Sequence, residues 1–249
     1  MPRYRNNFIS EAIIRADFEK PLNALNTRVD DDLEIEVMKF FTLKEVREAF
    51  SESIRIDQTG KVDRDKVAFN EWNFWANEKK KRFCITQNFM FIAYNKYINY
   101  DDFTTPFMSI LRELASIYPD FSCKRLGMRY INNVRLDEHD VFAWDDYLDK
   151  KCLSILSIPE KVDQIRRAFH ILELNYPEDD FKVKFQYGIH NPDYPSEVKQ
   201  KLFVLDYDAY KDGILTKDEL IHLVPLFHSK IELIFESVIT QRLRDKLNE

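Results

Sequence analysis

Residues 123–136 hold the densest group of side chains that could do chemistry in this 249-residue sequence. Successive side chains of an extended strand point to opposite faces, so Arg125, Arg129, Asn133 and Arg135 would share one face. A guanidinium group binds a carboxylate or a phosphate through two parallel hydrogen bonds. We expect these four residues either to bind an anionic ligand or a protein partner, or to pair with carboxylates on neighbouring strands.

Gly127 lies between two of these arginines on the same face. Glycine has no side chain, so a ligand or another backbone could approach the strand at this position. The sequence therefore makes residues 123–136 the leading candidate for a binding surface.

A second group with useful spacing is His228, Glu232 and Glu236. Residues four apart lie on one face of a helix, so these three could hold a metal ion or form an acid–base pair. Glu219 and His222 have the spacing of one di-iron ligand pair, but the second pair that such a site needs is absent from the sequence. Hydrogen bonding on a helix surface is the simpler interpretation, and we expect neither a metal nor a cofactor.

The segment 208–219 has acidic residues at several positions of a calcium-binding loop. Tyr210 occupies the third ligand position, and the preceding residues have the pattern of a strand rather than a helix, so we expect no calcium there. Thr216 followed by Glu219 predicts a capping box that opens a final helix.

Signatures of catalysis are weak. The sequence contains no GxSxG motif, and Cys84, Cys123 and Cys152 share no local signature with a histidine. Asp163 with residues 180–182 has the composition of a metal-dependent nuclease motif, but the alternation around it is that of a half-exposed strand. The sequence predicts no catalytic residue, and the alternative is a hydrolase or nuclease whose site is assembled only in three dimensions.

Composition excludes several other classes. The four glycines are isolated from one another, which excludes a P-loop and a dinucleotide-binding fingerprint. With 37 basic and 43 acidic residues the formal charge is −6, which argues against a general nucleic-acid coat or a cationic membrane binder. Binding of single-stranded nucleic acid on Trp72, Phe74 and Trp75 would need a local basic groove. The basic run 79–82 is more simply a solvated hairpin tip.

The periodicity of apolar residues predicts the elements that must position these side chains. The expected strands are 8–18, 67–76, 82–97, 123–136, 169–176, 181–189 and 201–210. The expected helices are 43–54, 101–118 and 216–247, and Pro225 should kink or split the last of them. Together they predict an α+β fold: an antiparallel sheet in a single compact unit, built from two similar strand-hairpin-helix halves (1–136 and 137–249), with a long amphipathic C-terminal helix packed on the sheet.

Three stretches, 7–18, 125–132 and 228–240, resemble as a set a sporadically distributed bacterial protein family of about this length. Its hallmarks are a glycine-x-Arg-Tyr-Ile-Asn strand and a C-terminal Phe-Glu-x-x-Ile-Thr helix. The resemblance implies an accessory bacterial role, such as phage defence or a toxin–antitoxin module. It carries no catalytic residue over to this chain.

The cysteine spacing and the charged N-terminal region predict a soluble cytoplasmic protein without disulfides. The longest uncharged run has 13 residues (83–95), too few to span a membrane. We therefore expect a non-enzymatic binding or regulatory component that acts by contact with a protein partner or a second copy of itself. A membrane partner is not expected, and nucleic acid is a weaker alternative than protein.

Overall fold

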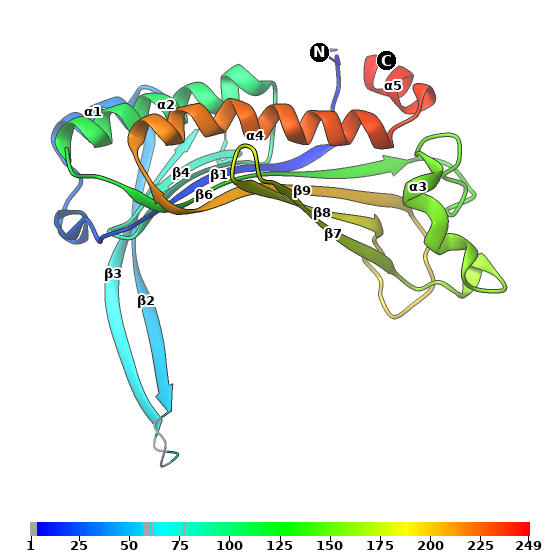
Figure 1. Ribbon diagram of the computed structural model, residues 1–249, viewed down its shortest axis with the longest axis horizontal. Coiled ribbons are helices and arrows are strands. Elements are labelled where there is room, and N and C mark those ends of the chain that lie inside the picture. The colour runs from blue at the N-terminus through cyan, green and yellow to red at the C-terminus, as the bar shows by residue number, and fades with distance from the viewer. Residues whose placement is uncertain (1–3, 57–59, 61, 77) are drawn as a thin grey trace.

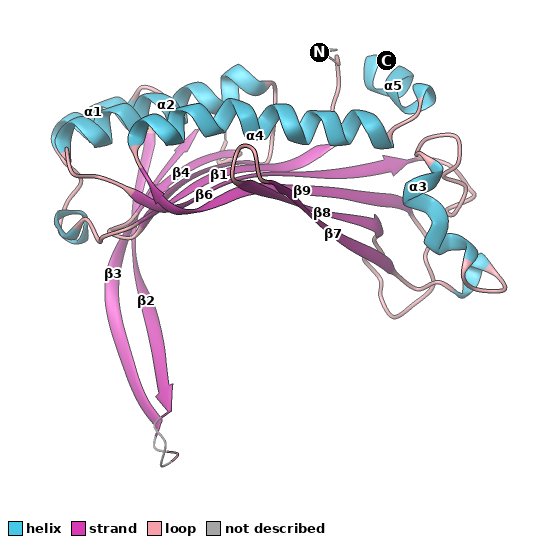
Figure 2. Cartoon of the chain, in the orientation of Figure 1, coloured by secondary structure: helices cyan, strands magenta, loops and turns pink. Residues whose placement is uncertain are grey.

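The computed structural model describes residues 4–56, 60, 62–76 and 78–249. It contains a nine-stranded sheet in the order β2-β3-β4-β5-β1-β6-β9-β8-β7, and each neighbouring pair is antiparallel. The helices α1, α2 and α4 cover one face of the sheet (Figure 1), while no helix of the described residues covers the opposite, concave face (Figure 2). The predicted α+β fold with a long C-terminal helix is confirmed.

The strands follow the expected alternation of apolar and polar residues. Their bounds are β1 Ile9–Phe18, β2 Leu43–Ile56, β3 Val62–Ala76, β4 Lys81–Ile85, β5 Phe89–Tyr94, β6 Cys123–Leu136, β7 Ala168–Tyr176, β8 Phe181–Ile189 and β9 Lys201–Leu215. The stretch 82–97, expected as one strand, is two strands. The stretch 8–18 is central, because β1 lies between β5 and β6.

The described helices are more numerous than expected, and the long C-terminal one is shorter than expected. Their bounds are α1 Asp31–Met38, α2 Tyr100–Ile117, α3 Lys150–Leu153, α4 Lys217–Val238 and α5 Gln241–Asn248, with 3-10 turns η1 Asn23–Asn26, η2 Ser154–Ser157 and η3 Val162–Gln164. The N-caps of α1 and α2 are asparagine or aspartate side chains that accept a backbone N–H, as helix starts require. In the described part of the chain, no helix is both long and apolar enough to cross a membrane.

The expected helix 43–54 is wrong, because these residues form β2. The segment has good helix formers, but Val46, Phe50 and Ile54 also fall on one side of a strand, with glutamates between them. All fourteen residues of β2 pair with β3, so long-range backbone pairing overrides the local helical propensity. The helix at this end of the chain is instead α1, which the sequence analysis missed.

The C-terminal helix is interrupted at a different place from the one expected. Helix α4 continues through Pro225, and the break falls at Ile239 and Thr240, before α5. Pro225 is exposed, so water can bind the carbonyl group that its missing N–H leaves free. Thr216 and Glu219 form the predicted capping box at the start of α4.

Helix α4 is part of the core. Its buried residues are Leu220, Leu223, Val224, Phe227, Ile231 and Val238. The Phe227 ring packs against that of Phe181 on β8, with ring centroids 5.1 Å apart. The apolar stripe of this helix therefore packs against the sheet.

Gly188 in β8 is a strand glycine that the backbone requires. Its φ is +152°, and a Cβ atom there would lie 1.8 Å from the carbonyl oxygen of Ala168. The close approach of β7 and β8 at this end of the sheet leaves no room for another residue type.

Candidate functional site

The predicted arginine face of β6 lies on the concave, helix-free face of the sheet, opposite acidic residues of β9. Arg129 Nε and Nη2 donate to the two carboxylate oxygens of Asp206, at 2.8 and 2.7 Å. Arg125 Nη1 donates to Asp212 Oδ1 at 2.9 Å, and its guanidinium group lies 4.1 Å from the ring centre of Tyr210. These two arginines are therefore held by carboxylates of the same sheet.

Electrostatics on this face follow from the pairing. Hydrogen bonding to Asp206 raises the pKa of Arg129. Burial raises the pKa of Asp208, although Arg125 and Arg129 oppose this effect. A Cβ atom on Gly127 would meet Asp208 Oδ1 at 3.6 Å, an ordinary van der Waals contact. The glycine therefore marks no unusually close backbone approach.

The other two predicted residues do not join this network. Asn133 is half-buried and its backbone N–H donates to the carbonyl of Phe8, which fixes the start of β1. Arg135 is exposed near the end of β6 and borders a shallow hollow beside α5. The structure places all four residues on one face of β6. Their side chains do not converge on a common point where one ligand could bind.

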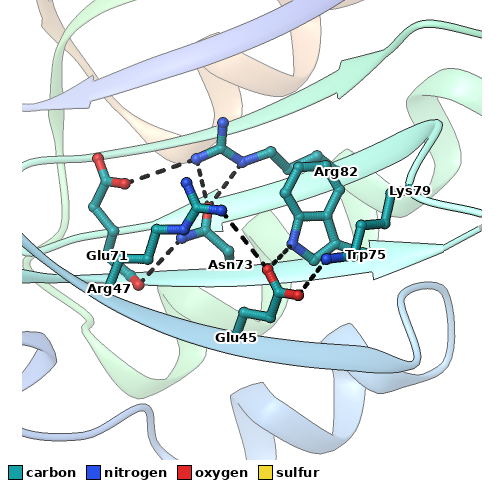
Figure 3. A network of polar contacts seen from close by, with 7 residues as sticks. All are labelled: Glu45, Arg47, Glu71, Asn73, Trp75, Lys79 and Arg82. Atoms are coloured by element: carbon teal, nitrogen blue, oxygen red, sulfur yellow. Dashed lines mark hydrogen bonds and ion pairs between the residues drawn. The ribbon is translucent and has the colours of Figure 1, made fainter.

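A second polar network lies on the same face at the base of β2 and β3 (Figure 3). Arg82 donates to Asn73 Oδ1 and lies 3.7 Å from the carboxylate of Glu71. Glu45 accepts the indole N–H of Trp75 at 3.0 Å and a hydrogen bond from Lys79. The donors and acceptors of this network are therefore hydrogen-bonded or ion-paired with one another.

The aromatic strand residues are not free to stack on nucleotides. Trp72 is buried, and its Nε1 donates to the carbonyl of Leu25 at 2.6 Å. Phe74 is fully buried, and the Trp75 ring has Arg82 5.3 Å from its centre. The basic run is paired as well: Lys81 contacts Asp102, and Lys80 contacts Glu78.

Beyond this base, β2 and β3 continue as a two-stranded ribbon that projects from the sheet (Figure 1). We call residues 46–56 and 62–71 the hairpin arm: β4 pairs only with Trp72–Ala76 of β3, so the arm begins at Val46, the cross-strand neighbour of Trp72. Within the described residues, β2 pairs with no strand other than β3, so its outer edge carries no neighbouring strand.

The hairpin arm exposes apolar side chains on one side. Val46, Phe50 and Ile54 are 49%, 52% and 57% exposed, and the cross-strand register places all three on the same face. Exposed Glu48 and Glu52 alternate with them. A long edge strand with this pattern is a template for pairing with another chain.

A cavity of about 360 Å³ lies on the other side of the sheet, between α4, the middle of β6 and β9, the segment 4–9 and the 97–101 loop. Residues lining it include the histidine and both glutamates of the predicted i, i+4, i+8 group. Its walls are otherwise mainly tyrosine, phenylalanine, asparagine and isoleucine. These three residues therefore share a cavity wall as well as one helix face.

His228 is packed among rings of this cavity. Its imidazole stacks on Tyr100 with centroids 4.2 Å apart, and its Nδ1 is 3.3 Å from the hydroxyl of Tyr130. Burial lowers the pKa of His228 to about 4, so the ring is neutral at neutral pH.

The two glutamates differ in how they are compensated. Glu236 accepts the hydroxyl of Tyr4 at 2.6 Å and is paired with Arg244 at 2.9 Å. Glu232 lies 3.7 Å from His228 Nε2, and no lysine or arginine of the described residues is within ion-pair distance of it. Burial raises the pKa of Glu232.

Tyr207, on β9, also lines the cavity and is fully buried. Its hydroxyl has no hydrogen-bond partner among the described residues, which is uncommon for a buried polar group. Tyr207 falls within a regular strand pattern, so its place in the sequence does not mark it as a site residue. Only the fold brings it under α4.

The remaining candidates are not assembled into a site. Asp180 pairs with Lys211 at 3.3 Å, and Lys182 lies 3.6 Å from Glu173. Burial raises the pKa of each cysteine thiol, which leaves it a poor nucleophile. Across residues 4–56, 60, 62–76 and 78–249, no three His, Cys, Asp or Glu side chains are grouped as metal ligands would be.

Comparison with known proteins found no match: no family model, no curated protein and no solved structure matches this chain. The family resemblance of the three motif stretches stays a prediction.

Proposed function

We propose that the protein is a non-enzymatic binding component that acts by contact with another protein, through the free edge of β2 in the hairpin arm. The observation that carries this proposal is the fourteen-residue edge strand with Val46, Phe50 and Ile54 exposed on one face. A two-stranded ribbon is marginally stable on its own, and a third strand would complete it. An accessory role in bacteria, such as phage defence, remains a proposal that rests on the family resemblance.

Charge and pattern define the partner segment. A strand added to β2 would place alternate side chains opposite Val46, Glu48, Phe50, Glu52 and Ile54. The complementary segment is an extended peptide whose facing side chains alternate between apolar and basic. Backbone hydrogen bonds would supply affinity, and this alternation would supply specificity.

Site-specific crosslinking in the native host tests the proposal. A photoreactive amino acid at position 50 should give one dominant adduct with another protein. The same residue at position 171 is the matched control, because Ile171 is 65% exposed on β7 at the opposite edge of the sheet. Equal adduct patterns at the two positions, or no adduct at position 50, would refute the arm as the contact.

The alternative of a hydrolase or nuclease draws its support from the cavity, where His228 and Glu232 are neighbours. The residues that line the cavity include no serine, threonine or cysteine, so a hydrolase would have to activate water. A panel of ester and phosphodiester substrates would test it, and turnover that disappears in Glu232→Gln would favour this alternative.

A further inference from the structure

The cavity beneath α4 has two polar groups that make few polar contacts with the described residues. The Tyr207 hydroxyl is completely buried and lacks a hydrogen-bond partner in the described residues. The Glu232 carboxylate has no described lysine or arginine at ion-pair distance, whereas neighbouring Glu236 is paired with Arg244. A buried donor and a carboxylate that pairs with no described lysine or arginine, in one cavity, favour a ligand that carries both a cation and a hydrogen-bonding group.

The walls and the charge of the cavity select the ligand chemistry. Tyr97, Tyr100 and Phe235 contribute aromatic surface, and Glu232, Glu236 and Asp101 contribute negative charge. Aromatic rings with a nearby carboxylate are typical of sites for organic cations. These carboxylates would repel an anionic ligand. His228, which is neutral at neutral pH, and Arg244, which is already paired, would not offset this repulsion.

We propose that this cavity binds a small organic cation, in which an ammonium group on an aromatic or apolar body pairs with Glu232 and a second polar group hydrogen-bonds to Tyr207. The volume of about 360 Å³ accommodates a single-ring amine. The site is separate from the hairpin arm, which projects away from the sheet and from α4 (Figure 1).

Three probes of matched shape separate charge from apolar burial: tyramine, its neutral analogue tyrosol and its anionic analogue 4-hydroxyphenylacetate. Calorimetry on the purified full chain should show tyramine binding at least about tenfold more tightly than tyrosol, with the anion weakest. Glu232→Gln should remove the preference for tyramine over tyrosol. Glu160→Gln, a change at an exposed loop residue, is the control and should leave all three affinities unchanged.

Tyr207→Phe supplies a second, independent test. Removing an unsatisfied hydroxyl should raise the melting temperature of the ligand-free protein and weaken tyramine severalfold. The same variant should leave the affinity for 2-phenylethylamine, which lacks the phenolic hydroxyl, unchanged. The proposal is overturned if no amine binds at millimolar concentration, if tyramine and tyrosol bind equally, or if Glu232→Gln leaves the preference intact.

Discussion

The arginine face of β6 and the hairpin arm belong to the same sheet but differ in how far the chain satisfies them. On β6, the Arg129 fork is bound by Asp206 and Arg125 is bound by Asp212, with Tyr210 beneath it. On the arm, Phe50 and its apolar neighbours are exposed, and the outer edge of β2 carries no described strand. The first region is completed internally, and the second is the one that we propose another chain completes.

Two kinds of charged or apolar pattern look alike in a sequence: groups that pair within the chain, and groups that stay exposed. The two regions are one example of each. Groups that are satisfied internally contribute to folding, so their replacement should lower stability. Groups that remain exposed contribute little to folding, so their replacement should alter binding and leave stability near that of the wild type. Substitutions in the two kinds of region therefore have opposite expected signatures.

The largest stability effect is expected for Phe227→Ala in α4. The ring is fully buried against Phe181, and removing a buried phenylalanine costs about 3–5 kcal/mol of unfolding free energy. Chemical denaturation should show a single transition shifted to lower denaturant. Leu233→Ala on the same helix is the control, since Leu233 is 54% exposed. Separate unfolding of α4 would contradict an internally completed core.

A pH effect of up to about 3 kcal/mol is expected from His228. Its pKa is lowered by burial to about 4 in the folded protein, against an ordinary value of 6.5. Between these values the unfolded chain binds more protons, so stability falls as the pH decreases from 6.5 towards 4. His228→Gln should reduce this slope and His222→Gln, at an exposed position, should not. An unchanged slope in His228→Gln would show that the ring is not held neutral.

Arg129→Ala should lower the unfolding free energy by about 1–2 kcal/mol, because it leaves the Asp206 carboxylate without its partner. The effect is limited by solvent, since the Arg129 side chain is 39% exposed. Arg135→Ala, which breaks no ion pair among the described residues, should stay within about 0.5 kcal/mol of the wild type. If Arg129→Ala were neutral and instead reduced partner binding, the arginine face rather than the arm would be the contact.

The smallest stability effect is expected for Phe50→Ser. Phe50 is about half exposed and contacts the Lys66 ammonium group 4.1 Å from its ring centre. Its replacement should change the unfolding free energy by less than about 0.5 kcal/mol in thermal or chemical denaturation. A loss as large as that of a core residue would mean that the arm is held by the chain itself.

Most of the sheet and α2 could be predicted from local patterns, because alternation and three-four spacing are set by residues close in sequence. The 43–54 stretch could not, because its helix formers are overridden by pairing with β3, which depends on distant residues. Likewise, His228 and Glu232 were recognisable as one helix face, but Tyr207 joins them only through the packing of β9 under α4. The sequence predicts that the arginines could pair with carboxylates on neighbouring strands, but it does not identify Asp206 and Asp212. Their identity depends on the strand order, which the sequence does not predict.

The central claim is that the hairpin arm contacts a protein partner. It is tested most directly by measuring how tightly the partner, once crosslinking has identified it, binds three purified chains. The wild type, Phe50→Lys on the arm and Ile171→Lys on the opposite edge would be compared by calorimetry, after confirming equal melting temperatures. If the hairpin arm is the contact, Phe50→Lys should weaken binding by at least about tenfold, because it places a cation opposite the basic, apolar partner strand. Ile171→Lys should bind as the wild type does. Equal affinity of all three chains would contradict the account.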